Sequence, residues 1–167
     1  MDLHGPLLSP KAVDDFIIIR ATRLVSDVQR ALVRNVLRAE DMPVLEWRLL
    51  FSIARFGSCH LAFITQRTSI DPAHGSRAAS ALEKKGMIVR SDDNENRRRK
   101  LLSLTPLGIE TFERIWPQAQ ENVSRITGGL GPKDFEDLKR LLDMANAAAQ
   151  AETTTTPQDI SSKEHAA

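Results

Sequence analysis

The chain has 167 residues, of which 41% are hydrophobic and 27% charged, as in a globular protein with its own core. It has no apolar run of about 18 residues, so we expect no membrane span. It has no signal-peptide pattern, and its one cysteine, Cys59, cannot form a disulfide within the chain. We therefore expect a cytoplasmic protein. The net charge is +1, but the charged residues are unevenly distributed. Residues 60–105 hold nine Lys and Arg and five Asp and Glu, whereas the rest of the chain holds 14 Lys and Arg and 17 Asp and Glu. Only the middle of the chain is therefore expected to bind a polyanion.

The first half of the chain is predicted to be helical. Apolar residues at helical spacing indicate a long helix over residues 11–39, which the Asp-Met-Pro sequence at 41–43 ends. This helix is apolar on more than one side, so it needs more than one partner. A second helix is expected over 44–56, ended by a left-handed Gly57, and a short third one over 59–67, with Ser58 as its N-cap.

The middle of the chain reads as a helix followed by a hairpin. Asp71 and Pro72 combine an N-cap with a proline at the first helical position, which predicts a helix over 72–85 that stops at Gly86. Residues 87–91 and 100–105 then read as two strands around the loop 92–99.

Two more helices follow. Thr105 and Pro106 repeat the N-cap and proline pattern and predict a helix over 106–127, which Pro117 is expected to kink. Its apolar stripe is predicted to be Ile109, Phe112, Trp116, Ala119, Val123 and Ile126. A last helix is expected over 132–150, and the polar segment from Glu152 is expected to be disordered.

This order of elements predicts a mainly α fold with a small β wing. It places a winged helix–turn–helix domain between long N- and C-terminal helices. The 72–85 helix has the size to enter the major groove of DNA, and the basic hairpin can reach the neighbouring minor groove.

The stretch SRAASALEKKGMIVRSDDNENRRRKLLSLTPLG, residues 76–108, resembles the MarR family of transcription regulators. The family pattern has a recognition helix ending in Leu-Glu-x-x-Gly, a strand ending in Arg, an Asp-x-Arg wing tip and a Leu-Thr-x-x-Gly exit. The matching residues are Leu82, Glu83, Gly86, Arg90, Arg98, Leu104, Thr105 and Gly108. With the flanking helices, the resemblance covers about residues 11–150. It implies a protein that binds double-stranded DNA and is released by a small, often phenolic or anionic, ligand.

Two positions depart from that pattern. Asn96 stands where the family has the Asp that holds the wing arginine, so a carboxylate within 92–95 would have to orient Arg98. Gly75 stands where a β-branched residue is usual. Glycine inside a helix costs about 1 kcal/mol relative to alanine, so it either permits a closer approach to DNA or loosens the helix.

The candidate DNA contacts lie on the recognition helix and the wing. Arginine, serine and histidine can bind base edges or phosphates, and the helix candidates are Ala73, His74, Ser76, Arg77 and Ser80. At the wing tip we assign Arg98 to the minor groove, whose negative potential favours arginine. Arg97, Arg99 and Lys100 are assigned to phosphates. The alternatives are an ordinary polar helix surface and a solvated loop.

Aromatic and basic residues elsewhere suggest a ligand pocket between the long helices and the winged domain. The candidates are Arg20, Arg23, Trp47, Phe51, Phe112 and Trp116. Aromatic residues at helical spacing also suit a plain core, and the two arginines could instead be exposed or pair with nearby aspartates.

Cys59 offers two further alternatives. A cysteine at a helix N-terminus can have a lowered pKa and act as a redox sensor; the family's peroxide-sensing cysteine lies in the first helix, where this chain has none. Cys59, His60 and His74 are three possible zinc ligands, but without a recognisable spacing. We favour a buried structural cysteine and expect neither a cofactor nor a metal.

The predicted organisation is an N-terminal dimerisation helix (1–43), a DNA-binding domain (44–105), C-terminal dimerisation helices (106–150) and a disordered tail (151–167). The long helices carry more apolar surface than one small domain can cover, so a homodimer is expected, with recognition helices about 34 Å apart on a palindromic operator. The predicted function is a transcriptional repressor released by a small ligand. The alternatives are a redox-switched regulator using Cys59 and a winged-helix protein-interaction module. An enzyme is not expected, because no phosphate loop, nucleophile–base motif or carboxylate pair is recognisable.

Overall fold

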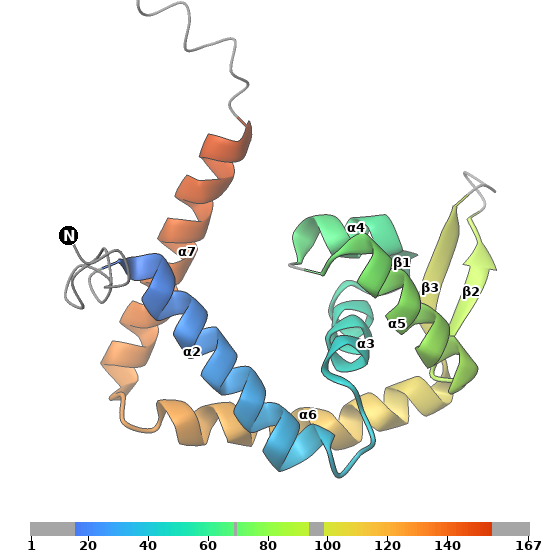
Figure 1. Cartoon of the computed structure of the whole chain (residues 1–167), viewed down its shortest axis with the longest axis horizontal. Helices are drawn as coiled ribbons and strands as arrows, with labels where there is room; N and C mark the ends of the chain where they lie inside the picture. Colours follow the sequence, from blue (N-terminus) through green and yellow to red (C-terminus); the bar gives the residue numbers. More distant parts are fainter. Residues whose placement is uncertain (1–15, 69, 94–98, 155–167) are drawn as a thin grey trace, which may run out of the picture. The chain divides into compact units, whose positions relative to one another are not determined.

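The computed structural model describes residues 16–68, 70–93 and 99–154, and the chain forms two compact units, residues 1–125 and 126–167. Figure 1 shows the order of elements. The bounds are α2 Ile17–Leu32, η1 Val33–Leu37, α3 Val44–Phe56, β1 Cys59–His60, α4 Leu61–Arg67, α5 Pro72–Lys84, β2 Ile88–Asp92, β3 Lys100–Leu104, α6 Pro106–Thr127 and α7 Pro132–Thr154. In the ranges that the structure describes, no helix is long and apolar enough to cross a membrane.

The long first helix is confirmed from Ile17 onward, whereas residues 11–15 lie outside the described residues. Helix α2 continues directly into η1, a π-helical turn that buries Val36 and Leu37. Asp41 has a positive φ of 46° and Pro43 is the N-cap of α3, so the chain breaks where the sequence predicts. Helix α2 buries none of its residues.

The prediction of a helix over 59–67 was wrong at its start. Cys59 and His60 form the short strand β1, which pairs antiparallel with β3 at Leu102 and Leu101. His60 then occupies the N-cap position of α4, and Ser58 does not cap the helix, because its Oγ lies 2.7 Å from Oγ of Ser103. The sheet therefore has three strands in the order β1-β3-β2 rather than two.

Helix α5 begins as its sequence predicts. The side chain of Asp71 accepts hydrogen bonds from the backbone N–H groups of Ala73 and His74, both at 3.0 Å. Gly75, for which a closer approach to DNA and a looser helix were the two alternatives, is buried inside the first unit. A Cβ atom at Gly75 would lie 3.2 Å from side-chain atoms of both Ile70 and Leu61. The glycine therefore allows α5 to pack tightly on α4 and on the residue before its cap.

A second glycine fixes the start of α6 against the end of α5. A Cβ atom at Gly108 would lie only 2.0 Å from the carbonyl oxygen of Met87. The same carbonyl accepts a hydrogen bond from the N–H of Thr105 at 3.1 Å. The hydroxyl of Thr105 donates to the carbonyl of Gly86 at 2.6 Å and accepts from the N–H of Gly108 at 3.1 Å. This interlock explains the Thr-x-x-Gly spacing, because a larger residue at 108 would meet backbone.

The predicted stripe of α6 was partly wrong. Ile109, Val123 and Ile126 are exposed by 46%, 38% and 39%. The buried face instead carries Gly108, Thr111, Ile115, Ala119 and Asn122. On this buried face, Nδ2 of Asn35 donates a hydrogen bond to Oδ1 of Asn122 at 2.8 Å.

Helix α7 also departs from expectation, because it continues to Thr154 and therefore includes Ala151 and Glu152, which were assigned to a disordered tail. The rest of that tail lies outside the described residues. Helix α6 runs without interruption through Pro117.

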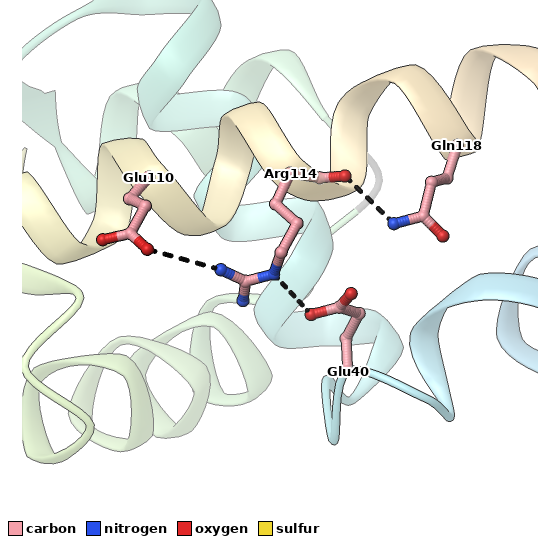
Figure 2. Close-up of polar contacts among 4 residues, drawn as sticks. All are labelled: Glu40, Glu110, Arg114 and Gln118. Atoms are coloured by element: carbon pink, nitrogen blue, oxygen red, sulfur yellow. Dashed lines mark hydrogen bonds and ion pairs between the residues drawn. The ribbon is translucent and has the colours of Figure 1, made fainter.

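The core of the first unit joins η1, α3, α4, α5 and α6. Its fully buried large side chains include Leu37, Leu49, Leu50, Ile53, Ile64, Leu82 and Ile115. A polar contact at its edge ties α6 to the connection between η1 and α3: Nε of Arg114 lies 3.0 Å from the carboxylate of Glu40 (Figure 2). Gln118 donates to the carbonyl of Arg114, one turn away on the same helix.

Candidate nucleic-acid interface and ligand cavity

The outer face of α5 carries the residues predicted to contact DNA. Ala73, His74, Ser76, Arg77 and Ser80 are all exposed, whereas Ala78, Ala79 and Leu82 are buried. The backbone N–H of His74 lowers the pKa of Asp71, and the N–H of Ala73 and the charges of His74 and Arg77 add to this effect. Arg77 lies one turn after His74 on this exposed face, and within the described part of the chain its guanidinium forms no ion pair.

Ser80 also forms a hydrogen bond to the sheet, which the sequence does not predict. Its Oγ accepts a hydrogen bond from Nη2 of Arg90 at 3.1 Å, and Nη1 of Arg90 lies 2.9 Å from the carboxylate of Glu83. Arg90 therefore joins β2 to α5, which fixes the sheet beside the recognition helix.

A basic hollow of about 640 Å³ lies between α4, α5 and the sheet. Its polar lining residues are His60, Gln66, Ser76, Ser80, Arg90, Arg99 and Lys100, and no acidic residue is among its described lining. Three arginines and lysines with hydroxyl groups form a surface suited to the phosphates of a nucleic acid backbone. Gln66 was not predicted as part of this surface.

The base of the wing is held by polar contacts between side chains. Asp92 pairs with Lys100 across β2 and β3, and Oδ2 of Asp93 lies 3.0 Å from Nε2 of His60. The other ring nitrogen of His60 lies 3.1 Å from the carbonyl oxygen of Lys100. Arg99 is exposed at the start of β3. Arg97 and Arg98, the predicted wing tip, lie outside the described residues.

A separate cavity of about 520 Å³ lies between α3 and α6 within the first unit. Trp47, Phe51 and Trp116 line it, as predicted from the sequence. Phe112 does not line it but stacks between the two tryptophans, with ring centroids 5.7 Å from Trp47 and 5.9 Å from Trp116. The cavity wall is therefore backed by a continuous aromatic stack.

The charged residues of this cavity differ from the prediction. Arg20 and Arg23 lie on α2 and are not among its lining residues. Arg48 and Arg55 line it instead, together with Ser52, and no acidic side chain is among its described lining. These three residues recur at spacings of four and three along α3, so they share one helical face. That spacing beside the aromatic residues was the signal in the sequence that could have identified them.

The sequence and fold have counterparts among known proteins. Residues 43–100 match the model of the MarR family. The chain is 28% identical over 120 residues to YhbI, an HTH-type transcriptional regulator of Bacillus subtilis, covering 72% of this chain and 78% of YhbI. Over residues 43–100, the chain is therefore similar to the MarR family of transcriptional regulators.

Solved structures of transcriptional regulators have a fold similar to that of this chain. A probable transcriptional regulator from Pseudomonas aeruginosa has a TM-score of 0.70 at 24% identity, covering 79% of this chain and 98% of that one. BpsR of Bordetella bronchiseptica, whose DNA binding is regulated by 6-hydroxynicotinic acid, has a TM-score of 0.73 at 21% identity, covering 85% and 98%.

Cys59 lies in a structural position. It is buried in β1, and burial raises the pKa of its thiol, which disfavours the reactive thiolate. The geometry thus gives no support to the redox alternative. Among the residues that the structure describes, no three His, Cys, Asp or Glu side chains gather into a potential metal site.

Both units expose apolar side chains on their long helices. On α2 these are Ile17, Ile18, Ile19, Leu24 and Val25, of which Ile17 is 68% exposed. On α7 they are Phe135, Leu141, Leu142 and Met144. Contiguous exposed apolar residues on this scale are typical of surfaces that bind another protein.

Proposed function

We propose that this regulator is a homodimeric repressor that leaves a palindromic operator when a small aromatic anion occupies the cavity. One observation carries the proposal. A single compact unit holds two separate surfaces without acidic lining, the basic hollow beside α5 and the aromatic cavity with Arg48 and Arg55. The first suits DNA phosphates and the second suits a flat molecule with a carboxylate or phenolate.

The relatives and the exposed helices support this proposal. BpsR, which shares the fold, responds to an aromatic acid. The apolar residues of α2 and α7 offer a surface for a second copy of the chain. Two-fold symmetry would then place the two α5 helices about one helical turn of DNA apart, ~34 Å.

The DNA part is tested by fluorescence anisotropy with the DNA upstream of the protein's own gene and with unrelated DNA, across a salt series. Arg77→Ala should weaken specific binding by about 1–3 kcal/mol, roughly 5–150-fold. Arg125→Ala is the matched control, because Arg125 is an exposed arginine of α6 away from the hollow. No DNA binding at low salt by a folded dimer would instead favour the protein-interaction module.

The ligand part uses the chain's own fluorescence. Both of its tryptophans, Trp47 and Trp116, line the cavity, so an aromatic occupant should change their emission. We expect 2-naphthoate to bind and its neutral isostere 2-naphthamide to bind much more weakly. Arg48→Gln should reduce this difference. Equal binding of the two compounds would contradict an anion-selective cavity.

A further inference from the structure

We propose that Ile70 is the positioning residue through which an occupant of the cavity displaces the recognition helix. This inference rests on the proposed ligand-controlled function. It names the contact that connects the cavity to α5.

Ile70 belongs to the cavity wall and to the recognition helix at the same time. Thr68 and Ile70 line the cavity from the connection between α4 and α5. Ile70 immediately precedes Asp71, whose carboxylate caps the first turn of α5. The exposed residues His74 and Arg77 lie on the first two turns of α5. A movement of Ile70 therefore acts directly on the cap of the helix that faces DNA.

The side chain of Ile70 is tightly packed against α4 and α5. Its side chain is 3% exposed, and a Cβ atom at Gly75 would lie 3.2 Å from its Cγ2. The same Cβ atom would also lie 3.2 Å from Cδ1 of Leu61 on α4. Protein interiors are packed as densely as organic crystals, so a displaced side chain moves its neighbours. An occupant of the cavity that displaces Ile70 therefore also displaces the backbone of α5 at Gly75.

Thr68 anchors the other side of this contact. Its hydroxyl donates a hydrogen bond to the carbonyl of Ile64 at 2.9 Å, and Ile64 is fully buried in the core. The α4 end of the connection is therefore fixed to the core. Ile70 and α5 are the part left to move when the cavity fills.

The first test measures coupling within each variant. The coupling is the ratio of the Kd for operator DNA with saturating 2-naphthoate to the Kd without it, so changes in either basal affinity cancel. We expect roughly 5–150-fold for the wild type, the range of typical allosteric couplings, and less than about twofold for Ile70→Ala, which removes Cγ2. Ile70→Val keeps Cγ2 and is the matched control, with coupling close to wild type. Wild-type coupling in Ile70→Ala would overturn the proposal and assign the signal to the long helices.

A second test needs neither the ligand nor DNA. Ala119 lines the cavity from α6, so Ala119→Phe fills part of it. We expect this change to speed amide hydrogen exchange in the first turns of α5, and to do so much less when combined with Ile70→Ala. Gln118→Phe, on the exposed side of α6, is the control and should have no effect there.

The two tests separate the inference from the proposed function. If wild-type protein binds no 2-naphthoate or no operator, the proposed function fails, and the exchange measurement still decides the role of Ile70. An equal exchange response to Ala119→Phe with and without Ile70→Ala would overturn the inference. Circular dichroism of each variant at the assay temperature confirms that it is folded.

Discussion

Replacing Gly108 with alanine should destabilise the protein far more than an ordinary Gly→Ala change in a helix. The added methyl carbon would lie 2.0 Å from the carbonyl oxygen of Met87. Carbon–oxygen contacts in proteins are about 3.3 Å or longer, so the start of α6 must shift by over about 1 Å relative to Met87. The obstacle is backbone, which cannot rotate out of the way as a side chain would.

The cost follows from what that shift breaks. The hydrogen bonds from Thr105 to the carbonyls of Met87 and Gly86 are lost, at about 0.5–1.5 kcal/mol each. Strain in the packed core adds about 1–3 kcal/mol. The better helix propensity of alanine offsets about 1 kcal/mol. We expect a net loss of about 1–5 kcal/mol in the free energy of unfolding.

Urea unfolding followed by circular dichroism, at one fixed protein concentration because a dimer is expected, measures this loss. With an m value of about 2 kcal/mol/M, the midpoint should fall by about 0.5–2.5 M. Gly129→Ala is the matched control, because Gly129 has open space around its Cβ position and no positive φ. If the two variants have the same midpoint, the interlock between Thr105 and Met87 does not hold α6 as described.

Three further predictions concern the cap, the thiol and the dimer. Because hydrogen bonds from backbone N–H groups to the charged carboxylate lower the pKa of Asp71, the stability that it adds over Asp71→Asn should be full at neutral pH and begin to fall only below about pH 4. Thermal unfolding of both proteins from pH 7 to about pH 2 measures this gap, and a gap of unchanged size over that range would contradict the reasoning. Cys59 should react with Ellman's reagent much more slowly in the folded protein than in urea, and equal rates would revive the redox alternative. Ile18→Glu should shift the protein from dimer to monomer in light scattering, whereas Val89→Glu, the same change at an exposed residue of β2, should leave it dimeric.

Local chemistry in the sequence was enough to predict most helices. Asp71 with Pro72 and Thr105 with Pro106 mark the starts of α5 and α6, because capping depends on neighbours within one helical turn. The end of α3 at Gly57 and of α5 at Gly86 follows from the positive φ of both glycines. The exposed face of α5 was also predictable, since its polar residues recur with the helical period.

Contacts between distant residues were decided only by the tertiary structure. Strand β1 exists because Cys59 pairs with Leu102, a residue far along the chain. The burial of Gly75 depends on Ile70 and Leu61 coming from other elements. The cavity forms where α3 packs on α6, so Arg48 and Arg55 of α3 line it, whereas Arg20 and Arg23 of α2 do not. A sequence records which residues can line a helical face, whereas packing determines which partner that face meets.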